Sequence, residues 1–272
     1  MKKILLPLCL PLFSAPALAG ADDIVNANNQ FEIQRISTHV EYTETGSGLF
    51  GTRKGILDTE TGPVPGFGIA SSRMKGPGNS YVHFEFSMLN GSTKYTGSLQ
   101  GGTFGSVISS SSASLMDFSA RFGSGYALRA PAMLTPFFEL GRHQWDRGVN
   151  YGETYTHNYF GLGVLGQYSP VNQLVLSAQV FAGRTFWSSI SVNSGPGVYG
   201  FSDSLGDSML SRYGLAADYA FTRKIHASIG IDYTRFQYGI SPVQFAGNVA
   251  TWEPDSKTRY TTLRIGLGYR FN

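Results

Sequence analysis

Apolar and polar residues alternate along much of this chain with a period of two. The closing segment shows the pattern clearly, because its odd positions are Leu263, Ile265, Leu267, Tyr269 and Phe271, while its even positions carry arginine, glycine or asparagine. Successive side chains of a β-strand point to opposite faces. The alternation therefore predicts a strand with one apolar face.

Ten segments of the chain alternate in this way. They lie at residues 36–42, 64–74, 82–88, 116–123, 138–141, 160–164, 174–180, 212–221, 225–233 and 261–272. The connections between them are alternately long (43–63, 89–114, 142–158, 187–209 and 238–258) and short. Short periplasmic turns, long extracellular loops and an even number of strands are typical of outer-membrane barrels. The pattern predicts an all-β fold, a ten-stranded antiparallel transmembrane β-barrel.

A soluble β-sandwich is the alternative fold, since it also contains many short strands. In a sandwich the apolar faces point inward, whereas in a membrane barrel they meet lipid and a glycine-rich polar face lines the lumen. Tyrosines near strand ends favour the barrel, because they are typical of an interfacial girdle; they are Tyr168, Tyr219, Tyr233 and Tyr269. Seven mid-strand residues are expected to contact lipid: Phe84, Phe118, Leu162, Leu176, Leu215, Ile229 and Leu267. In the first strand, Ile36, Val40 and Tyr42 form the apolar face and Glu41 lies on the other face.

The first nineteen residues have the features of a secretory signal. Lys2 and Lys3 precede the apolar run Ile4–Phe13, and Ala17, Leu18 and Ala19 form a small-x-small cleavage pattern. We therefore expect residues 1–19 to be a cleaved signal peptide and residues 20–272 to be one barrel domain. The single cysteine of the chain, Cys9, lies within the signal, so the mature domain contains no disulfide.

Composition and charge narrow the class of protein further. The chain has 34 Gly, 19 Phe and 15 Tyr but only 14% charged residues, and no apolar stretch after the signal is long enough for a transmembrane helix. Without Lys2 and Lys3, 21 − 2 = 19 basic residues face 18 acidic ones, which gives no argument for a nucleic-acid partner.

The last strand, "TTLRIGLGYRFN", resembles the C-terminal signature that the barrel-insertion machinery of bacteria reads, with the aromatic residue in the penultimate position. Through its overall pattern the mature chain resembles the small outer-membrane β-barrel proteins of Gram-negative bacteria, among which omptin proteases and some adhesins have ten strands. The resemblance implies localisation in the cell outer membrane. The partners it implies are membrane lipid and lipopolysaccharide, the insertion machinery and an extracellular ligand.

The polar strand faces predict a charged lumen. The residues expected to point inward are Glu41, Glu85, Asp117, Arg121, Glu139, Arg212, Asp218, Asp232, Arg264 and Arg270. Wide aqueous channels need roughly 16 strands or more, so these charges are expected to pair and to fill much of the bore. We also expect Arg212 to pair with Asp232, and Phe181 to fill lumen space beside Gly161 in a register that places the two opposite each other.

The predicted loops contain further candidates. Four aromatic residues are candidates for contact with a partner: Tyr199, Phe201, Phe245 and Trp252. The glycine- and serine-rich stretch "GGTFGSVISSSSAS" predicts a mobile loop. His143, Asp146, Glu153 and His157 surround one predicted hairpin loop; they fit an omptin-like protease, a lipid hydrolase or a metal site, but ordinary loop polarity explains them equally well.

The sequence therefore favours a barrel with a surface-interaction or envelope-structural role. The alternatives are a narrow porin-like channel for ions or small solutes and an omptin-like or lipid-modifying enzyme. We assign no catalytic residue, no metal ligand and no cofactor.

Overall fold

The computed structural model describes residues 21–48, 54–76, 78–98, 102–129, 131–246 and 249–271. The predicted signal peptide, residues 1–19, lies outside the described residues. Ten long strands form the barrel. The short β5 (Tyr126–Arg129) comes directly after β4 in the chain and, like β4, pairs with β6. The barrel strands are β1 (Gln30–Ser47), β2 (Lys54–Lys75), β3 (Ser80–Gly97), β4 (Val107–Ser124), β6 (Ala132–Arg147), β7 (Glu153–Val171), β8 (Leu174–Val192), β10 (Met209–Ala220), β11 (Ile225–Tyr238) and β14 (Asp255–Arg270).

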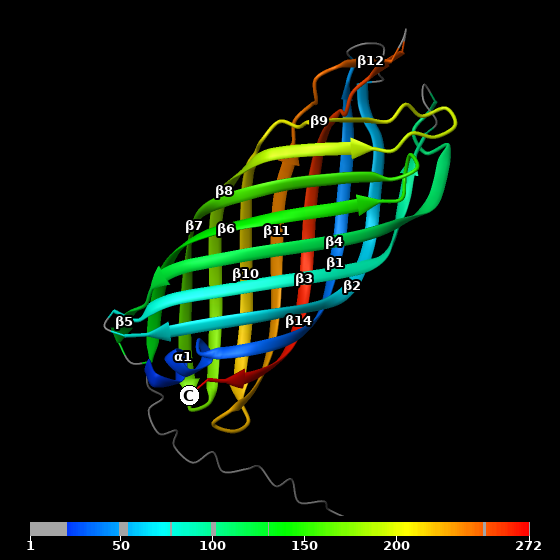
Figure 1. The fold of residues 1–272 in the computed structure, drawn as a ribbon. Coiled ribbons are helices and arrows are strands. Elements are labelled where there is room, and N and C mark those ends of the chain that lie inside the picture. The colour runs from blue at the N-terminus through cyan, green and yellow to red at the C-terminus, as the bar shows by residue number, and fades with distance from the viewer. Residues whose placement is uncertain are drawn as a thin grey trace, which may run out of the picture.

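The sheet closes on itself. Each strand pairs antiparallel with its neighbours in chain order, β8 pairs with β10, and β14 pairs with β1 to complete the ring (Figure 1). Closure removes both sheet edges, which is the condition for a sheet to cross a membrane. The predicted all-β fold, a closed ten-stranded antiparallel barrel, is confirmed, and each of the ten alternating segments overlaps a different strand of the barrel.

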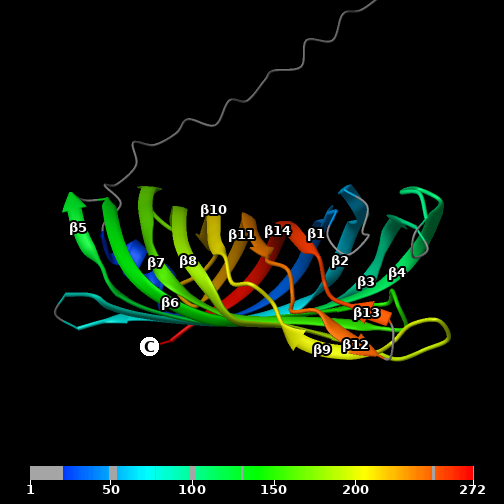
Figure 2. The same cartoon turned by 90° about the horizontal axis from the view of Figure 1, so that it is seen from above.

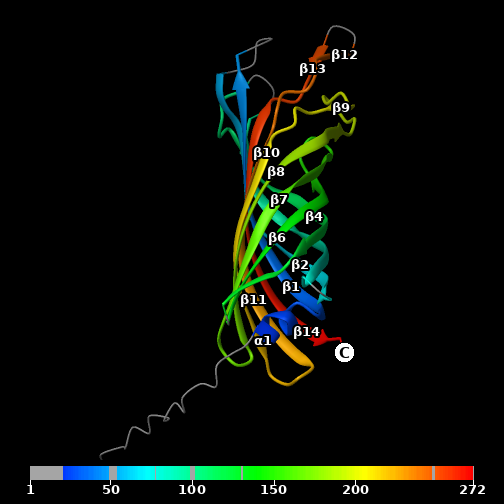
Figure 3. The same ribbon diagram turned by 90° about the vertical axis from the view of Figure 1, so that its left-hand side faces the viewer.

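The remaining elements lie at the two ends of the barrel. The helix α1 (Ala21–Ala27) lies with the C-terminus at the periplasmic end, whereas β9 (Phe201–Ser204) and the hairpin of β12 (Gln244–Ala246) and β13 (Val249–Thr251) lie at the opposite end (Figure 3). Figure 2 shows β9 and β12 close together beside the curved sheet. The Gln244 side chain of β12 donates hydrogen bonds to Ser202 and Asp203 of β9.

The outward faces carry an apolar belt. All seven residues expected to face lipid are exposed on the outside of the sheet, from 42% for Phe118 and Leu176 to 69% for Leu162. The belt continues through the outward residues of every barrel strand and ends, for example, at Leu140 on β6, Tyr233 on β11 and Leu263 on β14. The predicted orientation of the apolar faces is right at this height.

The strands continue beyond the belt toward the extracellular end, and there the polarity of the two faces reverses. Ile36, Val40 and Tyr42 are buried inside the barrel, whereas Glu41 points outward. The prediction for this part of β1 was wrong, because its outer surface faces water and its inner surface forms a packed core. The long predicted loops are correspondingly shorter, and the serine-rich stretch expected to be mobile forms the start of β4 from Val107 onward.

The strand register was predicted correctly for one hairpin and incorrectly for another. Arg212 lies opposite Thr234 and Gly214 opposite Asp232, as the three-residue turn between β10 and β11 predicts. In the β7–β8 hairpin Gly161 lies opposite Gly183, two residues from the predicted partner Phe181. The prediction assumed a five-residue turn, whereas β7 extends to Val171 and pairs with Leu174 across the two residues Asn172 and Gln173, with an irregularity between Tyr168 and Val171.

Candidate functional site

A network of charged side chains crosses the bore at the height of the apolar belt. Arg121 Nε lies 2.5 Å from Glu139, and Arg212 Nη1 lies 2.7 Å from the other oxygen of the same carboxylate. Tyr159 also donates to Glu139, at 2.9 Å. Glu139 is fully buried, so its charge is compensated by two arginines and a hydroxyl rather than by bulk water.

The network continues around the inner wall. Arg264 pairs with both Glu85, at 3.1 Å, and Asp232. Gln179 links the two halves, because it donates to Asp232 at 2.6 Å and accepts from Arg121 at 2.9 Å. We refer to these residues together as the lumen network: Glu85, Arg121, Glu139, Gln179, Arg212, Asp232 and Arg264. Seven different strands contribute one residue each.

The predicted pair of Arg212 with Asp232 does not form. Arg212 extends across the bore to Glu139, and its guanidinium lies 5.5 Å from the Phe181 ring and 5.7 Å from the Tyr159 ring. Asp232 is already neutralised by Arg264. Phe181 does fill the lumen, where its ring lies against the backbone positions of Gly161 and Gly183.

The structure distributes the other predicted lumen residues over three places. Asp117 accepts from His143 at 2.7 Å, above the network. Asp218 bonds to His226 at 2.7 Å and to Gln30 at 3.0 Å, below it. Arg270 lines a cavity of about 100 Å³ at the periplasmic end, together with residues of α1. Glu41 is the exception, because it lies on the outer face.

An aromatic layer fills the bore above the network. Its members stack or meet edge to face with ring centroids 5.3–5.8 Å apart: Tyr42, Trp145, Tyr155, Phe236, Tyr238 and Tyr260. All six are buried. The His143 and His157 rings lie beneath them, with centroids 5.1 Å apart, and bond to Tyr260 and Tyr238 respectively. Between this layer and the network lies a cavity of about 70 Å³, which has room for a few water molecules.

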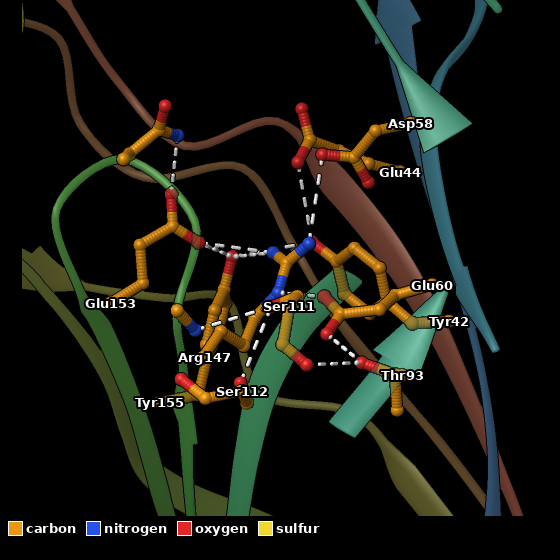
Figure 4. Close-up of polar contacts among 12 residues, drawn as sticks. Tyr42, Glu44, Asp58, Glu60, Thr93, Ser111, Ser112, Arg147, Glu153 and Tyr155 are labelled. Carbon is orange, nitrogen blue, oxygen red and sulfur yellow. Dashed lines mark hydrogen bonds and ion pairs between the residues drawn. The ribbon is translucent and has the colours of Figure 1, made fainter. Parts of the chain in front are cut away.

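The extracellular end of the bore contains one buried arginine among carboxylates (Figure 4). Arg147 pairs with Glu60 at 2.7 Å, Glu153 at 3.0 Å and Asp58 at 3.6 Å. Its Cζ atom lies 4.3 Å from the centre of the Tyr42 ring, and its guanidinium donates to the Tyr155 hydroxyl at 3.2 Å. We call these residues the Arg147 cluster: Tyr42, Asp58, Glu60, Arg147, Glu153 and Tyr155.

A loop residue is attached to this cluster. Glu253, between β13 and β14, accepts hydrogen bonds from the Tyr155 and Tyr42 hydroxyls, and its backbone N–H donates to Ser241 Oγ at 2.8 Å. Burial, together with the negative charge of Glu153, raises the pKa of Glu253 to about 8. Burial also raises the pKa of Asp58 and of Glu153. The carboxyl groups outnumber the one arginine, so a proton held by Glu253 lowers the repulsion.

The four residues predicted around one hairpin do not form a common site. His143 and His157 are buried in the bore below the aromatic layer, and Glu153 belongs to the Arg147 cluster. Asp146 accepts from Gln144 and Thr154 beside it. Among the loop aromatics, Tyr199 and Phe245 are exposed, Phe201 packs against the core and Trp252 is half-buried.

Sequence reasoning missed the Arg147 cluster and the aromatic layer, because most of their residues fall in segments predicted to be loops. The alternation does continue through them, with Trp145 and Arg147 on the inner face and Gln144 and Asp146 on the outer face. This continuation is the signal that the strands extend beyond the lipid.

Comparisons with known proteins identify the fold and no narrower relationship. No family model and no curated protein sequence matches the chain. The outer-membrane protease OmpT of Escherichia coli is similar in structure, with 9% identity and a TM-score of 0.56 over 90% of this chain and 97% of that one. Ail of Yersinia pestis also matches over 90% of this chain and 99% of its own, with 11% identity and a lower TM-score of 0.34.

No helix in the part of the chain that the structure describes is long and apolar enough to cross a membrane. The belt of outward apolar side chains, the closed sheet and the likeness to OmpT agree with one another. The chain has the fold of the small ten-stranded β-barrels of the Gram-negative outer membrane.

Proposed function

We propose that this protein is an integral outer-membrane barrel whose bore is closed by its own side chains and that acts through its extracellular end as a surface-contact or structural component of the envelope. The observation that carries the proposal is the filling of the interior by buried side chains at successive heights. The lumen network, the aromatic layer and the Arg147 cluster follow one another along the axis. Each contains side chains with less than a tenth of their surface exposed.

The periplasmic end supports the same proposal. Ile24 of α1 is fully buried against the inner wall, and Asn28, just after the helix, donates to Gln167 of β7 at 2.7 Å. Asn29 bonds to the backbone of Met74 on β2. These contacts hold the helix against opposite parts of the barrel wall, where it narrows the periplasmic opening.

The extracellular end offers surface for contact. Tyr199 and Phe245 project from neighbouring loop elements with 51% and 72% of their surface exposed. Exposed aromatic side chains are typical of contact surfaces. A partner of the barrel would meet these loops, together with the polar outer faces of the strands that extend beyond the belt.

Solute efflux from proteoliposomes tests the proposal. The refolded barrel is reconstituted with trapped sugars of graded size, and a porin reconstituted at the same protein-to-lipid ratio serves as the positive control. We expect efflux at the rate of protein-free liposomes for every sugar. Release of the smallest sugars at a rate approaching that of the porin would favour the narrow-channel alternative instead.

A further inference from the structure

Arginines gather on the outer surface just above the apolar belt. On four barrel strands the first polar outward residue above the run of apolar ones is an arginine, namely Arg35, Arg142, Arg184 and Arg235, although on β8 the apolar Phe186 follows Arg184 on the same face. On β14 the second polar outward position adds Arg259. This height is where an outer-leaflet lipid places its head group.

Two of these arginines face each other directly. Arg235 on β11 and Arg259 on β14 are cross-strand partners, and both are exposed on the outer face. Lys257 follows two positions farther from the belt, on the same face as Arg259. Like charges placed directly opposite each other destabilise a sheet. A negatively charged ligand between the two guanidinium groups would remove this cost.

The protein itself supplies little compensating charge. Arg259 lies 3.9 Å from Glu41, but both side chains are about half exposed, so this pair contributes little. In the described part of the chain, no carboxylate lies within 4.0 Å of the Arg235 guanidinium. The N–H groups of both arginines therefore remain available to an external acceptor.

The surface below the two arginines fits the rest of a lipid. Tyr233 lies directly below Arg235 on β11 and pairs with Tyr213 on β10, whereas Thr261 lies below Arg259 on β14. Leu215, Ile231 and Leu263 continue the exposed apolar surface toward the middle of the belt. Along β11 the order from the belt upward is thus aliphatic, phenolic and guanidinium. An acylated lipid with phosphate on its head group presents the matching order.

We propose that Arg235 and Arg259, assisted by Lys257, bind a phosphate group of an outer-leaflet glycolipid, of the multiply acylated and phosphorylated class to which lipopolysaccharide belongs. Guanidinium groups bind phosphate through paired, charge-assisted hydrogen bonds. A phosphate monoester carries up to two negative charges, which two opposed arginines neutralise. The site is independent of the closed bore and goes beyond the proposed function.

Native mass spectrometry of the refolded barrel tests the site. The protein in detergent micelles is titrated with purified short-chain lipopolysaccharide, and the bound fraction is counted for the wild type and for the double variant Arg235→Gln, Arg259→Gln. The matched control is Arg73→Gln, Arg223→Gln, which removes two exposed arginines near the periplasmic end. We expect the first variant to bind roughly tenfold or more weakly, since each basic group near a membrane surface contributes about 1 kcal/mol, and the control to bind like the wild type.

Three further titrations identify the ligand. We expect chemically dephosphorylated lipopolysaccharide to bind the wild type as weakly as intact lipopolysaccharide binds the Arg235 and Arg259 variant. Equal binding of the dephosphorylated form, or equal weakening in the control variant, would overturn the site. Displacement by millimolar inorganic phosphate, or equally tight binding of phosphatidylglycerol, would show that the arginines select an anion and not this glycolipid. All the substituted side chains are exposed, and heat-dependent gel mobility verifies that each variant is folded.

Discussion

At the scale of single residues, the main energetic problem of this barrel is the burial of charge. Glu139 is fully buried and is stable as an anion only because Arg121, Arg212 and Tyr159 converge on it. A buried ion pair offers little net stability over an apolar packing, but removal of one partner leaves the other charges without compensation. The lumen network is therefore more sensitive to a single substitution than its net contribution to stability suggests.

Substitution of Glu139 tests this sensitivity. In Glu139→Gln two buried arginines lose their common carboxylate, and we expect the free energy of unfolding to fall by about 3–5 kcal/mol. The control is Glu41→Gln, which removes a half-exposed carboxylate that is paired with the exposed Arg259, and we expect a change below about 1 kcal/mol. Urea unfolding in lipid vesicles, followed by tryptophan fluorescence, measures both. Similar effects of the two substitutions would mean that the network does not carry buried charge.

Residue partners across the bore are harder to predict than residue positions. The register of β10 and β11 correctly placed Asp232 opposite Gly214. The predicted partner of Arg212 was wrong. Its guanidinium reaches across the lumen to Glu139 on β6 and does not pair with Asp232 on the neighbouring strand β11. Alternation and turn length determine which residues share a wall, but the distance across the bore depends on the closed sheet as a whole.

At the scale of elements, the limit of prediction lies where the strands leave the lipid. Within the belt most apolar side chains point outward, as Phe67, Phe84 and Leu215 do, although Phe181 points into the lumen. Above it the outer face meets water, so the same rule assigned Ile36 and Glu41 of β1 to the wrong sides. Sequence periodicity shows that the two faces of a strand differ. It does not show which face points outward, because that depends on whether lipid or water surrounds the strand.

Strand β7 offers a matched test of the packing at its glycines. A methyl group on Gly161 would collide with the backbone of Ala182 and Gly183 and with the Phe181 ring, whereas one on Gly166 would meet Leu134 at an ordinary distance of 3.5 Å. We expect Gly161→Ala to destabilise the barrel by about 1–3 kcal/mol, as overpacked cores do. Gly166→Ala is expected to unfold at the same urea concentration as the wild type. The same urea titration measures both, and an unchanged midpoint for Gly161→Ala would contradict the tight contact.

The loop that carries Glu253 is expected to respond to pH. The raised pKa of Glu253, about 8, means that the folded state favours the protonated carboxyl. Its stabilising contribution is complete below pH 4.5, the ordinary value, and is lost as the pH rises through about 8. Deprotonated Glu253 would face Glu44, Asp58 and Glu153, and Arg147 would compensate just part of this negative charge.

Hydrogen exchange over residues 239–246 and 249–254 measures this response. We expect slow exchange at pH 6 and markedly faster exchange at pH 9, after correction for the intrinsic pH dependence. Glu253→Gln is neutral at both values and keeps the hydrogen-bonding shape, so its corrected exchange at pH 9 should remain slow. Equal protection of the wild-type loop at both pH values would show that this carboxyl group does not hold it.

At the scale of the whole molecule, the protein combines a closed sheet with an interior filled by side chains. Strand number, strand order and the alternation of short and long connections could be predicted from the sequence, because membrane crossing permits few solutions for an alternating chain. The filling could be predicted only in part. The charged residues of the lumen network were recognised on their strands, whereas the aromatic layer and the Arg147 cluster depend on strand segments beyond the lipid that resemble loops in the sequence.

The most direct test of the closed bore is single-channel recording from the refolded wild-type barrel in a planar bilayer, since an ion current would reveal even a path too narrow for sugars. With a porin as the positive control, we expect a baseline current without stepwise openings at 1 M potassium chloride and ±100 mV, because buried side chains occupy the bore at three successive heights. Regular, voltage-stable conductance steps that scale with the number of inserted barrels would contradict the account and identify the protein as a channel.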